Sequence, residues 1–176
     1  MMKRIIISGA PGTGKTSIIN TLELLNYHCF QEVSREIIAE QLKTGGSILP
    51  WDDLKSFSKE VIRLRKQQHA DANENLQFYD RSIIDSLAYL HKDSMDIPSE
   101  WDAMAINNRY YAKVFITAPW EAIYTTDTER KESFECAQQI HNHLIKMYLH
   151  YGYEIIEVPK TTIENRIKFI LAEIEK

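Results

Sequence analysis

The feature that most constrains this chain is a glycine-rich stretch near its start. Three isoleucines at positions 5–7 are followed by a match to the pattern G-x-x-x-x-G-K-[ST] and then by a helical pattern. This is the pattern of a phosphate-binding loop, and a full match arises by chance in under ~1% of random chains of this length. The predicted nucleotide-binding residues are Gly9, Ala10, Pro11, Gly12, Thr13, Gly14, Lys15, Thr16 and Ser17.

Each part of this loop has a physical task. Glycines let the backbone turn so that successive N–H groups converge on phosphate oxygens. The helix that follows directs its positive end at the same anion. The Lys15 ammonium reaches the outer phosphates, and the Thr16 hydroxyl is placed to bind Mg²⁺. The loop therefore predicts ATP and Mg²⁺ as cofactors.

Length and composition fit one domain spanning residues 1–176. Hydrophobic residues make up 44% and charged residues 26%, as in ordinary globular proteins. The net charge of −4 gives no electrostatic case for nucleic acid or an anionic membrane as a partner. The apolar run before Ser8 is too short for a signal peptide or a membrane span. Cys29 and Cys136 lack metal-type spacing, so we expect reduced thiols in a cytoplasmic protein.

Strand-like and helical patterns alternate along the chain. Strands are expected at residues 3–8, 27–33, 76–80, 113–117 and 153–158. Helices are expected at residues 15–25, 35–42, 52–73, 83–91, 99–107 and 134–151, and at the end of the chain. Ser34 is a predicted N-cap, and Thr161 with Glu164 a predicted capping box. This order predicts an α/β fold, the three-layer P-loop NTPase fold, with a five-stranded, mostly parallel sheet flanked by helices.

Charged residues stand at the ends of the second and third predicted strands. Glu32 ends the second, with Arg35 shortly after, and Asp80 followed by Arg81 ends the third. Ligands of open parallel sheets bind at this edge. Asp80 can face Mg²⁺ and the phosphates, and Arg81 offers a planar charged fork for phosphate or acceptor. The alternatives are a solvated strand end or first-turn helix charge for Glu32, and a surface ion pair for Arg35.

Two further groups of charges have open interpretations. Arg63 and Arg65 lie on the long helix predicted at 52–73, where a solvated face competes with contact to a substrate anion. Residues 124–135 are polar and contain Arg130. Such a stretch can be a lid that brings an arginine to the transferring phosphoryl group, or an exposed helix start.

Together these features resemble one known family. The resemblance extends over nearly the whole chain and is carried by residues 9–16, 32–36, 78–82, 129–132 and 151–159. The family is the small P-loop ATPase and kinase-like AAA-domain family, which is related to the ribosylnicotinamide kinase domain of the bacterial NAD regulator and has a GTP-binding animal relative. Only the phosphate loop is a sharp motif; the remaining segments match in order and spacing.

More broadly, the layout resembles nucleoside and nucleotide kinases. In deoxynucleoside kinases a Glu after the second strand serves as base, and an acidic-Arg-Ser triplet follows the third strand. Glu32 and the triplet Asp80-Arg81-Ser82 fit these places. The sequence lacks the Asp-Glu and Asp-x-x-Gly signatures of AAA+ motors and GTPase switches, and it lacks the guanine-reading Asn-Lys-x-Asp.

The resemblance and the residues together imply phosphoryl transfer from ATP to a small nucleoside, nucleotide or related metabolite. Lys15 would hold the outer phosphates, and Thr16 with Asp80 the Mg²⁺. Glu32 or Asp80 would accept the hydroxyl proton, with Arg35 and Arg81 orienting the acceptor and Arg130 stabilising charge.

Two other functions stay open at this point. One is a nucleotide-binding regulator or slow ATPase or GTPase, and a weaker one is a lipid- or protein-interaction module. The sequence does not distinguish ATP from GTP, and it is compatible with a homo-oligomer.

Overall fold

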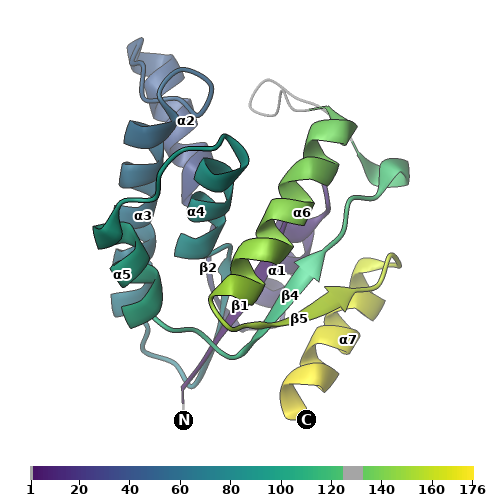
Figure 1. The fold of residues 1–176 in the computed structure, drawn as a ribbon. Helices are drawn as coiled ribbons and strands as arrows, with labels where there is room; N and C mark the ends of the chain where they lie inside the picture. Colours follow the sequence, from purple (N-terminus) through teal and green to yellow (C-terminus); the bar gives the residue numbers. More distant parts are fainter. Residues whose placement is uncertain (1, 125–132) are drawn as a thin grey trace.

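The computed structural model describes residues 2–124 and 133–176, and within them the chain forms a five-stranded sheet with helices on both faces (Figure 1). Every strand pair is parallel, and the strand order is β2-β3-β1-β4-β5. The strands are β1 (Lys3–Gly9), β2 (His28–Phe30), β3 (Leu76–Asp80), β4 (Lys113–Thr117) and β5 (Glu154–Val158). The predicted α/β P-loop fold is confirmed, with a sheet that is wholly rather than mostly parallel.

One or two α-helices follow each strand. They are α1 (Lys15–Leu24), α2 (Val33–Thr44), α3 (Leu54–Ala70), α4 (Ile83–Lys92), α5 (Ser99–Asn107), α6 (Phe134–His150) and α7 (Ile163–Glu175), with a short 3-10 helix η1 (Glu121–Ile123). No helix within the described ranges is long and apolar enough to cross a membrane.

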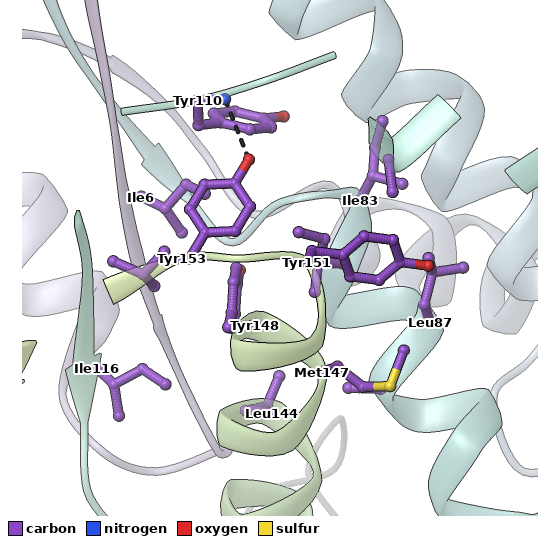
Figure 2. Close-up of a cluster of buried hydrophobic side chains, with 14 of the residues drawn as sticks. Ile6, Ile83, Leu87, Tyr110, Ile116, Leu144, Met147, Tyr148, Tyr151 and Tyr153 are labelled. Atoms are coloured by element: carbon purple, nitrogen blue, oxygen red, sulfur yellow. Dashed lines mark hydrogen bonds between the residues drawn. The ribbon is translucent and has the colours of Figure 1, made fainter. Parts of the chain in front are cut away.

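The two faces of the sheet carry separate hydrophobic cores. Because side chains alternate along a strand, Ile5 and Ile7 point to one face, where α1 and α7 pack, and Ile6 points to the other. On that second face α3, α4, α5 and α6 form the larger core (Figure 2). Within it the backbone N–H of Tyr110 donates to the Tyr153 hydroxyl over 3.2 Å. Figure 1 shows α6 in front of the sheet and α1 behind it.

Three local predictions were wrong. Strand β2 ends at Phe30, earlier than expected, because Glu32 is the N-cap of α2 and Val33 is already helical. Ser34 is therefore not the N-cap; its N–H donates to the Glu32 side chain over 3.3 Å. The predicted Thr161 capping box is also absent, because Thr162 caps α7 instead.

Candidate phosphate and acceptor site

A cavity of about 430 Å³ opens at the carboxyl ends of β1 and β3. One part of its wall is the phosphate loop, and another is formed by residues of α2, α3 and α4. Of the predicted loop residues, those from Pro11 to Ser17 line the cavity, whereas Gly9 and Ala10 are not among its lining residues. Glu32, Arg35, Asp80 and Arg81 line the same cavity, so the predicted groups from three strand ends converge.

Glycine is required where the loop leaves the sheet. At Gly9, with φ of 147°, a Cβ atom would stand 2.2 Å from Oγ1 of Thr117 on β4. The Thr13 hydroxyl lies 2.6 Å from the same Thr117 oxygen and donates to the Ala10 carbonyl over 2.9 Å. These buried contacts hold the loop against the sheet before any ligand binds.

The start of α1 is left open for an anion. Its N-cap is Gly14, in the left-handed conformation, and no side chain caps the first N–H groups. Unsatisfied N–H groups at a helix N-terminus attract negative charge. Lys15 is buried beside them, and its ammonium donates to the Ala10 carbonyl over 2.8 Å. Burial, followed by the nearby Arg81 charge, lowers the pKa of Lys15 to about 7. A bound phosphate would reverse this effect by supplying the missing negative charge.

Glu32 ties two buried arginines together. Its Oε1 accepts from Nη2 of Arg65 over 2.7 Å, and its Oε2 accepts from Nε of Arg81. Burial opposes ionisation of this carboxyl, but the Arg81 and Arg65 charges outweigh it and lower the pKa of Glu32 to about 2. Glu32 is therefore no solvated strand end. Arg63, in contrast, is exposed and pairs with Glu60 on the surface of α3.

Asp80, unlike Glu32, has a raised pKa. It is 2% exposed, and its Oδ1 has no hydrogen-bond partner among the described residues. Burial, together with the Glu32 charge, raises the pKa of Asp80 to about 6. A buried carboxylate oxygen without a partner is costly unless a cation or proton meets it. The Asp80 side chain is thus suited to binding a ligand rather than to stabilising the ligand-free fold.

The donor set fits Mg²⁺. No cluster of three or more His, Cys, Asp or Glu side chains suited to a metal occurs in the described part of the chain. Mg²⁺ does not need one, because it binds through one or two protein oxygens together with phosphates and waters. The unpartnered oxygen of Asp80 and the hydroxyl of Thr16 are such oxygens, and both residues line the cavity.

Arg81 is held in a conformation that few non-glycine residues adopt. Its φ is 75°, and its N–H donates to the Ile7 carbonyl over 3.0 Å. Its Nη1 donates to the Gly9 carbonyl, also over 3.0 Å. The left-handed backbone costs on the order of 1–3 kcal/mol, and such strain is concentrated at functional sites. The guanidinium is thereby fixed between the phosphate loop and Glu32.

Sequence reasoning missed the role of Asp85. This buried residue accepts from the Ser8 hydroxyl over 2.6 Å, from the Ser82 N–H over 2.8 Å and from the Tyr148 hydroxyl. It also lies 3.4 Å from Nη1 of Arg81. The capping box that Ser82 and Asp85 form at the start of α4 is a pattern visible in the sequence.

The far side of the cavity is apolar. It is lined by hydrophobic side chains of α2, α3 and α4 and of the loop between α2 and α3, namely Ile38, Pro50, Leu54, Phe57, Val61 and Tyr89. Ser34, Ser58 and Ser86 are the small polar residues among them. An apolar wall with a few polar groups is typical of sites for small organic molecules. Arg130, the predicted lid arginine, lies outside the described residues.

Comparison with known proteins assigns the family. A family model described as an AAA domain matches residues 4–166. The chain belongs to this AAA-domain family. No curated protein matches the sequence.

Solved structures share the fold at low sequence identity. Deoxyadenosine kinase from M. mycoides with bound dATP has a TM-score of 0.69 and 14% identity, covering 99% of this chain and 100% of its own. NadR protein in complex with NR has a TM-score of 0.71 and 15% identity over 99% of this chain, which spans about half (51%) of NadR. Shikimate kinase from Acinetobacter baumannii, in complex with shikimate, has a TM-score of 0.62 and 17% identity, covering 99% and 94% of the two chains. These structural similarities confirm that the protein has a P-loop kinase fold.

Proposed function

We propose that the protein transfers the γ-phosphoryl group of a nucleoside triphosphate, with Mg²⁺, to the hydroxyl of a small acceptor. The acceptor class is a nucleoside, a nucleotide or a related metabolite. The observation that carries the proposal is that one cavity joins the phosphate loop to an apolar wall, with Glu32, Asp80 and Arg81 between them. The loop accounts for the phosphates of a nucleotide, and the apolar wall offers an organic acceptor a place beside them.

In this proposal the loop N–H groups and Lys15 hold the β- and γ-phosphates, and Thr16 and Asp80 bind Mg²⁺ directly or through water. When bound, Mg²⁺ neutralises charge on the phosphates. Arg81, fixed by Glu32 and the Gly9 carbonyl, faces the cavity as a rigid donor for the acceptor or the transferring group.

The surroundings of the two acids support different roles. Both oxygens of Glu32 accept hydrogen bonds from arginines, and its pKa near 2 makes it a weak proton acceptor. Asp80 has an oxygen available and, in the ligand-free protein, a pKa of about 6, which suits a general base at neutral pH where Mg²⁺ is bound through water rather than directly. We therefore assign proton acceptance to Asp80 and the positioning of two arginines to Glu32. Arg35 is assigned to orient the acceptor, and Arg130 to stabilise charge on the transferring phosphoryl group.

The test is an acceptor screen with MgATP and MgGTP as alternative donors. Nucleosides, nucleotides and hydroxy acids are first ranked by the rise in melting temperature that they cause. The best candidates are then incubated with each donor, and phosphorylated products are sought by mass spectrometry. A product that gains one phosphoryl group and needs Mg²⁺ supports the proposal. Release of inorganic phosphate at the same rate with and without every acceptor supports the slow NTPase or regulator instead.

A further inference from the structure

A second fully buried arginine lies against the phosphate loop from the opposite side of the sheet. Arg166 is on the first turns of α7 and is 0% exposed. Its Nη1 donates to the Thr13 carbonyl over 3.1 Å, and its Nε donates to the Pro159 carbonyl over 3.2 Å. Its guanidinium carbon is 5.8 Å from the centroid of the Trp120 ring. Neither sequence patterns nor the proposed mechanism assigns this residue a task.

The charge of Arg166 has no counter-ion within residues 2–124 and 133–176. Its contacts there are carbonyls and an aromatic ring, and Nη2 has no hydrogen-bond partner. Arg65, the other fully buried arginine, differs in having the Glu32 carboxylate at 2.7 Å. A buried cation without an anion is unfavourable. Phosphates bound at the adjacent loop would supply the missing negative charge.

The contact with Thr13 connects this charge to the phosphate site. The Thr13 carbonyl and the Gly14 N–H belong to the same peptide unit. When a carbonyl accepts from a cation, the N–H of its peptide becomes a stronger donor, because neighbouring hydrogen bonds polarise one another. Gly14 is the N-cap of α1 and lines the cavity. A Cβ on Gly14 would lie 2.7 Å from Nη1 of Arg166, so the guanidinium packs directly on this turn.

We infer that Arg166 is a positioning residue for the triphosphate: it fixes and polarises the Thr13–Gly14 peptide and contributes the positive charge that bound phosphates neutralise. It acts through the loop backbone and does not touch the nucleotide. The inference rests on the nucleotide binding of the proposed function but not on the identity of the acceptor.

Binding of MgATP and of inorganic tripolyphosphate with Mg²⁺, measured by calorimetry, tests the inference. Arg166→Met keeps much of the side-chain volume and removes the charge and its donors. We expect it to weaken the binding of both ligands by about 10- to 100-fold, because it removes the charge-assisted hydrogen bond that fixes the Thr13–Gly14 peptide, and this is the usual value of such a bond. Orthophosphate is titrated in the same way, and its affinity should fall less than that of tripolyphosphate, because the effect is one of charge.

Arg109→Met is the control for the same kinds of contact at an exposed position. Arg109 also donates to a carbonyl, that of Tyr151 over 2.7 Å, and lies over an aromatic ring, that of Tyr153. It precedes β4, at the end of the sheet away from the phosphate loop. Its substitution removes similar contacts and should leave MgATP and tripolyphosphate binding at the wild-type value.

Arg166→Lys covers the case in which Arg166→Met does not fold. A single ammonium reaches one carbonyl rather than two, so binding about three- to tenfold weaker is expected. A folded Arg166 variant that binds tripolyphosphate as the wild type does overturns the inference. An equal loss for orthophosphate and tripolyphosphate, or the same loss in Arg109→Met, also overturns it. If the wild type itself binds no MgATP, the proposed function fails as well, and the two failures are thus distinguished.

Discussion

Replacing either of two buried aspartates of the site by Asn should change the stability of the protein, but in opposite directions. Asp80 is 2% exposed and lacks a partner for Oδ1 among the described residues, whereas Asp85 is 1% exposed and accepts from Ser8, Ser82 and Tyr148. Asp80→Asn should therefore stabilise the ligand-free protein at neutral pH. Asp85→Asn should destabilise it by about 2–4 kcal/mol, because an amide nitrogen would face existing donors.

The size of the Asp80 effect follows from its pKa. Below about pH 4 the carboxyl is protonated in both the folded and the unfolded chain, so it does not change the free energy of unfolding. Between about pH 4 and pH 6 the unfolded chain loses this proton first, and the free energy of unfolding falls as pH rises. The gap between a pKa of about 6 and the ordinary value of 3.8 corresponds to about 3 kcal/mol, present in full above pH 6.

Asp80→Asn removes this penalty, apart from the cost of burying an amide. We expect the variant to be about 2 kcal/mol more stable than the wild type at pH 7.5 and about 1 kcal/mol less stable near pH 4, where only the cost of burying the amide remains. Urea unfolding at both pH values measures this, and the same variant should lose phosphoryl transfer. An Asp80→Asn protein less stable than the wild type at pH 7.5, or a difference independent of pH, would refute the reasoning.

Three further substitutions test other parts of the site. Lys15→Ala should weaken MgATP binding by about 10- to 100-fold in calorimetry while the circular dichroism spectrum stays unchanged, and wild-type affinity would contradict this. Glu32→Gln should lower the free energy of unfolding in urea by about 3–5 kcal/mol because it breaks buried ion pairs. Glu60→Gln breaks an exposed pair and should lower it by under about 1 kcal/mol. Equal losses would count against the pairing of Glu32 with two buried arginines. The contribution of Glu32 to the free energy of unfolding should decrease as pH falls from about 4.5 toward 2. Gly9→Ala places a Cβ against Thr117 and should lower the melting temperature and abolish MgATP binding, so a stable, binding variant would show that the loop can shift.

Much of the fold could be predicted from the sequence because its signals are local. Strands β3 and β4 and helix α5 have the predicted bounds to the residue. Asp80 ends the apolar run of β3, and Pro119 follows shortly after β4. The phosphate loop is a contiguous motif and needs no tertiary information. Prediction failed where one residue served two tasks: Glu32 looks like the end of a strand, but it caps α2.

The candidate site was predictable only in part, for a related reason. The strand-end rule placed Glu32, Asp80 and Arg81 at one edge of the sheet, and they do line one cavity. The partners of these residues depend on packing between distant segments. The Arg65–Glu32 pair joins residues 33 positions apart, and the Arg166–Thr13 contact joins residues 153 apart. Periodicity assigns a charged residue on a helix to solvent, so it could not show that either arginine is buried.

The central claim is that the cavity holds a nucleotide and an organic acceptor at the same time and moves a phosphoryl group between them. A single-turnover experiment with ATP labelled on the γ-phosphate tests it most directly, using enzyme in excess, Mg²⁺ and the acceptor that most raises the melting temperature. The account predicts that the label appears on the acceptor, and that Asp80→Asn prevents its transfer. Label found on inorganic phosphate alone, at the same rate with and without the acceptor, would contradict it.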